Sequence, residues 1–108
     1  MLLARDGNNN GALVGYAVWM QALDEIELLD LAIIPSMRRC GIASHLLAAL
    51  IHTAHTHAVI RILLEVRASN LGAQALYHTH GFQEMGRRHA YYRGESQRED
   101  AVLMERLR

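Results

Sequence analysis

The residues best suited to chemistry in this sequence are small or basic, and they stand together as Arg38-Arg39-Cys40-Gly41-Ile42-Ala43-Ser44. The stretch separates an apolar run at 27–34, expected to be a strand, from an apolar run at 42–57, expected to be a helix. Gly41 and Ala43 keep side chains away from the first helical turn, so its backbone N–H groups and the helix dipole can face an anion beside two arginines. The pattern predicts a phosphate site, and an ordinary strand-to-helix turn is the alternative.

The neighbouring sequence predicts the elements that hold this stretch. Residues 13–22 alternate between two faces as a strand does, and the next strand, 27–34, ends at Pro35 because proline cannot donate a ladder hydrogen bond. The helix at 42–57 carries one apolar stripe, and the apolar run at 60–66 suits a central strand. A strand–helix–strand unit of this spacing crosses over right-handedly, so its two strands should run parallel.

The last third of the chain predicts a second helix and a closing strand pair. Ser69 or Asn70 can cap the helix, and Gly81 can end it. Residues 82–92 and 101–107 should then pair as antiparallel strands. We therefore expect an α/β fold with a mixed sheet, built around the strand–helix–strand core.

Further motifs follow the anion-binding stretch in a definite order. The stretch itself fits the pattern Arg/Gln-x-x-Gly-x-Gly/Ala, and after it come Leu64–Asn70, Ala75–Tyr77, Gly81-Phe82, Tyr91-Tyr92 and Arg98–Ala101. This series resembles the GNAT superfamily of N-acetyltransferases, and within it the bacterial branch that acetylates ribosomal proteins at an N-terminal alanine. The resemblance runs from Leu13 to Leu107. Family members normally begin with a further strand and two helices, so we expect an N-terminally shortened GNAT-like fold.

The resemblance implies that the chain binds acetyl-CoA as a cosubstrate, with the pantetheine arm between the two parallel strands. The backbone of the first strand would bind the pantetheine amides, and the loop before the helix would hold the pyrophosphate. Arg38 would pair with phosphate or face solvent, and Cys40 is a reactive thiol or contributes only its backbone N–H. The implied cofactor-binding residues are Leu31, Ala32, Ile33, Arg38, Arg39, Cys40, Gly41, Ile42, Ala43, Ser44 and Asn70.

The same resemblance implies two catalytic side chains. Glu65 matches the general base, which would contribute about 10²–10⁴-fold to the rate, and an ion pair with Arg67 or Arg61 is its alternative role. Tyr77 matches the general acid, placed toward the cofactor sulfur. A phenol with a pKa of about 10 is a weaker acid than a thiol of about 8.5, so Tyr77 would mainly hydrogen-bond the developing thiolate. An aromatic ring packed on the sheet is the alternative.

The implied acceptor is the N-terminus of a protein or peptide. An α-amine has a pKa of about 7.7–8.0, so about a tenth is neutral at pH 7, against less than about 0.1% for lysine. Such an acceptor needs only a modest base. Tyr91 and Tyr92 match aromatic positions that line the peptide groove, with a packed strand pair as the alternative. Lysine or small-amine acetylation, and acetyl-CoA binding with little catalysis, remain open.

Acidic residues near the presumed acceptor entrance offer a further way to attract an amine. Glu27 is an alternative base and a candidate substrate-binding residue, because other family branches place a carboxylate on this strand. The group could instead be a solvated hairpin, which suits Asp24 and Glu25 best. Its members are Asp24, Glu25, Glu27 and Asp30.

Composition argues against several other classes of function. The 108 residues suit one domain, and 11 basic against 11 acidic residues create no net field for nucleic acid or an anionic membrane. A single cysteine suits the cytoplasm, and no apolar run approaches the ~20 residues of a membrane span. We expect no metal, because no cysteine or carboxylate completes a tetrahedral set with the histidines, taken as surface residues. A second copy could cover apolar surface in a homodimer. The histidines concerned are His52, His55, His57, His78 and His80.

Overall fold

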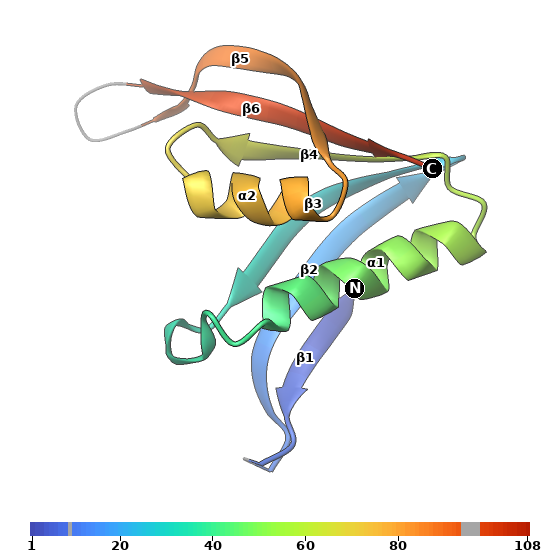
Figure 1. Ribbon diagram of the computed structural model, residues 1–108, viewed down its shortest axis with the longest axis vertical. Coiled ribbons are helices and arrows are strands. Elements are labelled where there is room, and N and C mark those ends of the chain that lie inside the picture. The colour runs from blue at the N-terminus through green and yellow to red at the C-terminus, as the bar shows by residue number, and fades with distance from the viewer. Residues whose placement is uncertain (9, 94–97) are drawn as a thin grey trace.

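The computed structural model describes residues 1–8, 10–93 and 98–108, and side chains for all of these except 90–93 and 98. Strands and helices alternate in the central part, and strands stand at both ends (Figure 1). In chain order the elements are β1 (Leu2–Asp6), β2 (Ala12–Ala22), β3 (Glu25–Ile33), a 3-10 turn (Pro35–Met37), α1 (Ile42–Thr56), β4 (Arg61–Arg67), α2 (Leu71–Thr79), β5 (Gln83–Arg93) and β6 (Arg98–Leu107).

The described strands form one mixed sheet in the order β1-β2-β3-β4-β6-β5. Strands β3 and β4 run parallel, joined by the crossover through α1, and each of the other neighbouring pairs is antiparallel. The predicted mixed α/β sheet, its parallel central pair and its closing antiparallel pair are therefore confirmed.

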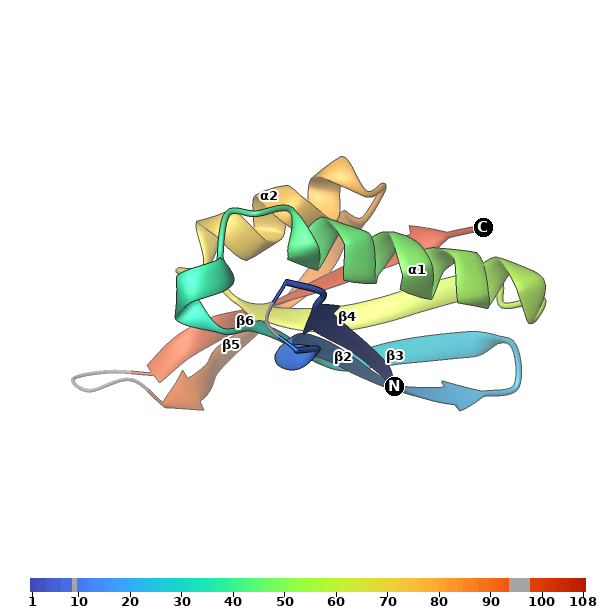
Figure 2. The ribbon, with the colours of Figure 1, turned by 90° about the horizontal axis from the view of Figure 1, so that it is seen from below.

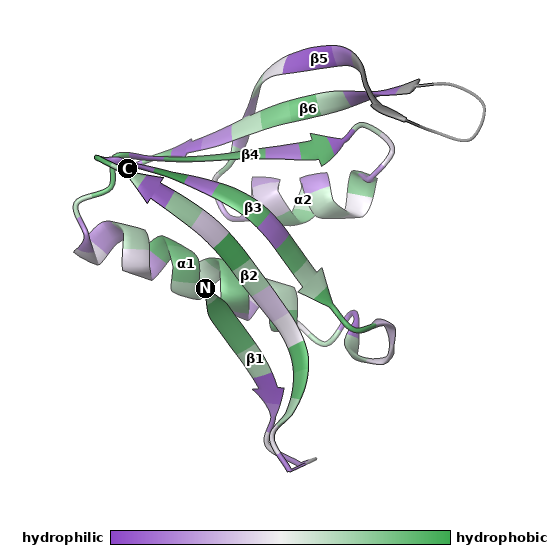
Figure 3. Cartoon of the chain, turned by 180° about the vertical axis from the view of Figure 1, so that it is seen from behind, coloured by the Kyte–Doolittle hydropathy of each residue, from purple (hydrophilic) through white to green (hydrophobic). Residues whose placement is uncertain are grey.

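Both helices cover the same face of the sheet, which leaves the opposite face of the strands without a covering helix among the described elements (Figure 2). The core lies under the helices, where the apolar stripe of α1 meets inward-facing strand residues. Figure 3 views the sheet from the opposite side, where polar and apolar residues alternate along β3 and β4. This alternation assigns odd-numbered residues of β4 to the open face, because Ile62, Leu64 and Val66 are buried against the helices.

Local signals account for most element ends. Asn70 caps α2 by accepting a hydrogen bond from the Ala73 N–H at 3.1 Å, as one of the two predicted caps. Gly81, with φ of 87°, follows the helix in the left-handed conformation. Phe82, however, precedes β5 instead of opening it, and its fully buried ring packs 5.8 Å from that of Tyr77. Among the described residues, no helix is both long and apolar enough to span a membrane.

Candidate active site

The central feature is a wedge between the two parallel strands. The ladder between β3 and β4 runs from Glu25 opposite Arg61 to Leu28 opposite Leu64 and ends there. Both strands nevertheless continue, β3 to Ile33 and β4 to Arg67. Figure 1 shows the two strands diverging beyond this point. Backbone groups on their facing edges are thus available to a ligand that lies between them.

A β-bulge explains why β3 leaves its partner at this level. Val18 of β2 lies opposite Asp30, whereas the next residue, Trp19, lies opposite Leu28. Leu29 is therefore one residue more than the partner strand can match. Such an extra residue bends the strand that contains it and increases its twist. The bend begins directly after the last residue that pairs with β4.

The wedge contains a cavity of about 260 Å³. Side chains from three elements line it, so that two strands and a helix converge on one space. The lining residues are Leu28, Leu29, Asp30, Leu31, Leu64, Glu65, Val66, Arg67, Asn70, Ala73 and Tyr77. Four predicted site residues, Leu31, Glu65, Asn70 and Tyr77, are thereby brought together from separate elements.

Tyr77 approaches the cavity from the helix-covered face. Its side chain is 8% exposed, yet its hydroxyl has no hydrogen-bond partner among the described residues and is not a fully buried atom. The hydroxyl therefore opens on the cavity. Desolvation by burial raises the pKa of Tyr77, and the negative charge of Asp30 raises it further. Tyr77 accordingly remains a protonated hydrogen-bond donor throughout the neutral range.

Glu65 approaches the same cavity from β4 and belongs to the open face of the sheet. Its carboxylate lies 3.4 Å from the guanidinium of Arg88 in β5, and its side chain is 25% exposed. The sequence had suggested Arg61 or Arg67 as the ion-pair partner of Glu65. Arg61 instead contacts Glu25 and Glu105. Arg67 lies 3.5 Å from Glu99. A partly exposed carboxylate at a cavity mouth can accept a proton from a bound amine.

Asp30 is the one member of the predicted acidic group that lines the described cavity. Leu31 is paired with Ala17, which packs in the core, so Asp30 points to the open face. There its carboxylate accepts a hydrogen bond of 2.7 Å from the hydroxyl of Tyr16. This contact, followed by the charge of Asp30, raises the pKa of Tyr16. Glu27, on the same strand, is exposed and is not among the described cavity-lining residues.

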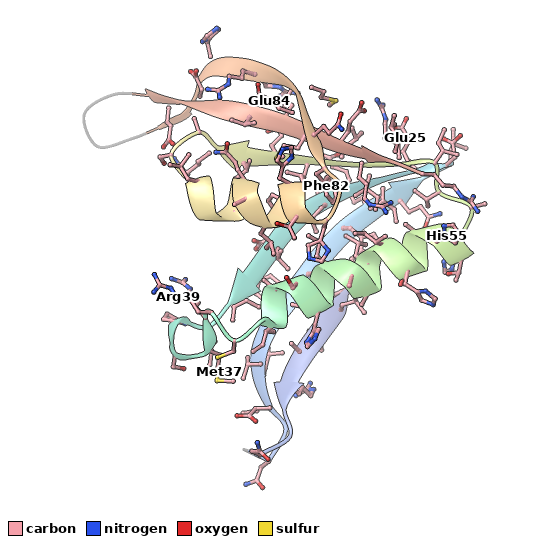
Figure 4. The ribbon with its side chains drawn as sticks, in the orientation of Figure 1. Glu25, Met37, Arg39, His55, Phe82 and Glu84 are labelled. Atoms are coloured by element: carbon pink, nitrogen blue, oxygen red, sulfur yellow. The ribbon has the colours of Figure 1, made fainter. Side chains whose placement is uncertain are left out.

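The anion-binding stretch begins α1 in the way that the sequence predicted. Gly41 is the residue before the helix, with φ of 80°, a conformation that glycine adopts without strain. No side chain caps the first turn, and no acidic residue stands in it. Arg39 extends outward from the loop before the helix (Figure 4). Positive charge and backbone N–H groups therefore coincide at this end of α1.

A second cavity, of about 300 Å³, lies at this helix end. One side of it is formed by Gly72 and Leu76 of α2, whose neighbours Ala73 and Tyr77 line the wedge. The two cavities thus lie along the same helix. The other lining residues are Ile33, Met37, Arg38, Arg39, Gly41, Ile42, Ala43 and Ser44. A ligand with a phosphate end and a narrow chain would fit such a pair of spaces.

Polar contacts join the loop to its surroundings. Arg38 donates through Nε to the carbonyl oxygen of Ile33 at 3.3 Å, which ties the loop to the end of β3. Ser44 Oγ lies 3.2 Å from Nε2 of His80. His80 is half-buried, and the other histidines predicted to lie on the surface, His52, His55, His57 and His78, are exposed. Cys40 is exposed, with its Sγ 3.6 Å from the Arg38 carbonyl oxygen.

The remaining predicted residues lie on β3, at the start of α2 and on β5. Leu31, Ala32 and Ile33 pair with β2 along one edge of β3, which leaves the other edge toward the wedge. The capping bond of Asn70 uses its Oδ1, so a contact with a ligand would be donated by Nδ2. Tyr91 and Tyr92 belong to β5, but their side chains fall outside the described residues.

Glu99 of β6 secures the loop before α2. Its carboxylate accepts a hydrogen bond of 2.6 Å from the Ser69 N–H. Hydrogen bonds from Ser69 lower the pKa of Glu99, and Arg67 acts in the same direction. Across the residues that the structure describes, no group of three or more His, Cys, Asp or Glu residues could hold a metal ion.

Known proteins resemble this chain in both sequence and structure. The Acetyltransferase (GNAT) family matches residues 1–82. Ribosomal protein bS18-alanine N-acetyltransferase of Escherichia coli (strain K12) is 40% identical over 95 residues, 88% of this chain and 64% of that protein. The crystal structure of the ribosomal-protein-S18-alanine N-acetyltransferase from Escherichia coli has a TM-score of 0.88 at 38% identity, covering 92% of this chain and 64% of the other.

A third comparison concerns a structure with a ligand. A GNAT family acetyltransferase from Elizabethkingia anophelis, crystallised with acetyl-CoA bound, has a TM-score of 0.82 at 18% identity. It covers 92% of this chain and 71% of the other chain, and this likeness is one of fold. The chain spans 64% of the length of the curated Escherichia coli relative.

Proposed function

Because this chain belongs to the GNAT family of acetyltransferases, we propose that it transfers the acetyl group of acetyl-CoA to an amine. The wedge between β3 and β4 is the observation that carries the proposal. Both strands continue past Leu28 and Leu64 without pairing, and a cavity lined by Glu65, Asn70 and Tyr77 fills the space. A slot of this kind accepts a chain-like thioester between two free backbone edges.

The residues at the N-terminus of α1 suit the diphosphate of acetyl-CoA. Gly41 turns the chain into the helix, the first turn has neither a side-chain cap nor an acidic residue, and Arg38 and Arg39 add positive charge. We propose that the loop holds the diphosphate while the backbone of residues 31–33 and the Asn70 amide hold the pantetheine arm. The bound thioester supplies the acetyl group.

The cavity also supplies the two proton-handling groups. Glu65 would take the proton that the attacking amine must lose as its nitrogen forms the new N–C bond. The C–S bond breaks in the same exchange, and the departing thiolate needs a hydrogen-bond donor. Tyr77 would donate that bond, because its raised pKa keeps the phenol protonated. These two groups approach the cavity from opposite faces of the sheet.

The acceptor that we propose is the α-amine of a ribosomal protein that begins with alanine. The name of the Escherichia coli relative, 40% identical to this chain, supports it. The chemistry of the site supports it as well, because about a tenth of an α-amine is already neutral at pH 7 and needs only a carboxylate as base. Such an acceptor implies that the protein acts in the cytoplasm, and a homodimer stays a prediction.

A peptide assay tests this function. The protein is mixed with acetyl-CoA and a peptide that begins with alanine, and the peptide is weighed by mass spectrometry. A mass gain of one acetyl group is expected, and its position is read by fragmentation. A peptide with a blocked N-terminus and one internal lysine serves as the matched control. Faster reaction of the lysine would replace the α-amine by a lysine acceptor, and no gain on either peptide would refute acetylation of a protein or peptide amine.

A further inference from the structure

We propose that Asp30, oriented by Tyr16, binds the ammonium form of the acceptor amine and so selects a charged N-terminus at the mouth of the wedge. This inference rests on the proposed function and names a residue that binds the acceptor. Asp30 lies on β3 and Glu65 on β4, both on the open face and both lining the cavity. An amine that enters from this face would pass between the two carboxylates.

The charge of Asp30 is not neutralised by its surroundings. Glu65 has Arg88 as a partner, and Glu99 has Arg67. Among the described residues, Asp30 has instead a neutral partner, the Tyr16 hydroxyl at 2.7 Å, and makes no ion pair. A carboxylate without a counter-ion attracts a cation, and Asp30 is exposed, so a cationic amine that approaches the cavity from solvent can reach it.

The phenol of Tyr16 fixes the direction of this carboxylate. Its hydroxyl donates to Oδ2 of Asp30, which leaves Oδ1 for a second donor. An ammonium group carries three donors and can bind one carboxylate while a second one approaches. The influence of Asp30 reaches the cavity interior, because its negative charge contributes to the raised pKa of Tyr77. Asp30 would therefore hold the cationic amine beside Glu65, which removes the proton.

Equilibrium binding tests the assignment independently of turnover. An alanine-starting peptide and its N-acetylated form are titrated into the CoA-saturated protein by calorimetry. We expect Asp30→Asn to weaken binding of the free-amine peptide about tenfold, while binding of the acetylated peptide is unchanged. Tyr16→Phe keeps the charge of Asp30 but removes the hydrogen bond that orients its carboxylate. This variant should bind the free-amine peptide about two- to threefold more weakly. Asp24→Asn, in the exposed turn before β3, removes an equal charge and should change the affinity for neither peptide.

The salt dependence of peptide binding is a second measurement, and it would not change if Asp30 had only a structural role. Binding of the free-amine peptide should weaken with added salt in the unaltered protein and much less in Asp30→Asn. Two results would overturn the inference. One is that the unaltered protein and Asp30→Asn bind the free-amine peptide equally well, and the other is that Asp30→Asn loses as much affinity for the acetylated peptide as for the free-amine peptide. If the peptide binds with this preference but gains no acetyl group, the proposed function fails and the binding assignment stands.

Discussion

The two halves of the β3–β4 pair differ sharply although they belong to the same strands. In the first half, residues 25–28 and 61–64 form a continuous ladder. Arg61 closes that end through contacts of 2.7 Å to Glu25 and 3.1 Å to Glu105. In the second half the ladder is absent, and a cavity of about 260 Å³ takes its place.

The difference indicates that a small change in backbone register is enough to open a cavity between two parallel strands. Leu29 is the bulged residue, and β3 bends away from β4 directly after Leu28. Both halves use carboxylates on the open face, but for different purposes. Glu25 and Glu105 neutralise Arg61, whereas Asp30 and Glu65 stand at a cavity. Position relative to the bulge therefore separates the carboxylates that neutralise Arg61 from those that line the cavity.

The largest effect that would test this comparison comes from Glu65→Gln. We expect kcat to fall by about 10²–10⁴-fold, because the amide cannot accept the proton of the amine, while acetyl-CoA binding is retained. Glu105→Gln is a closely matched control. Both side chains pair with arginine on the same face, with exposures of 25% for Glu65 and 24% for Glu105. Steady-state kinetics and calorimetry measure the two properties, and equal kcat values for both variants would remove Glu65 from the base role.

A smaller loss is expected from Tyr77→Phe. The hydroxyl opens on the cavity and lacks a partner among the described residues, so its removal should leave the thermal midpoint nearly unchanged below pH 10. The rate should fall about 10- to 100-fold, as for one hydrogen bond to a developing charge. Because the folded-state pKa is raised, the stability of the unaltered protein is fully present below about pH 10 and falls as the pH rises through the folded pKa, whereas Tyr77→Phe, which has no phenol to ionise, should not show this loss. An unchanged kcat in Tyr77→Phe would contradict the donor role.

Sequence patterns predicted what is local and missed what depends on register. The start of α1 at Ile42 and the cap at Asn70 follow from nearby residues, so both were found where the structure has them, and anion binding at the helix start stays a prediction. The bulge at Leu29 depends on pairing with β2, so the sequence could not separate Asp30, which lines the cavity, from the other members of the acidic group, which do not. The contact of Glu65 with Arg88 joins residues of two separate strands, which spacing cannot show. The catalytic roles came from family resemblance, and they stay predictions.

Gly15→Ala should affect cofactor binding without touching the catalytic groups. Gly15 lies opposite Ile33, and a Cβ there would stand 2.8 Å from the carbonyl oxygen of Ala32 and 2.5 Å from Cδ1 of Ile33. Overpacking costs about 1–3 kcal/mol and would displace the end of β3, so the Kd of acetyl-CoA should rise on the order of tenfold. Gly7→Ala, with open space around its Cβ, is the control. Equal affinity in both variants would show that this strand end does not position the cofactor.

The smallest effect is expected from a substitution at Arg61, in the half where β3 and β4 are paired. Arg61 lies 36% exposed between its two carboxylates, so water and salt screen the contacts. We expect Arg61→Met, which keeps much of the alkyl stem, to lower Tm by no more than about 6 °C at low salt and by less at high salt. Because the ladder through Leu28 and Leu64 and the apolar core beneath it hold this half together, kcat and the Kd of acetyl-CoA should not change. A loss of acetyl-CoA binding in folded Arg61→Met protein would mean that the paired end of β3 and β4 sets the width of the wedge. The two halves would then be coupled and not independent regions.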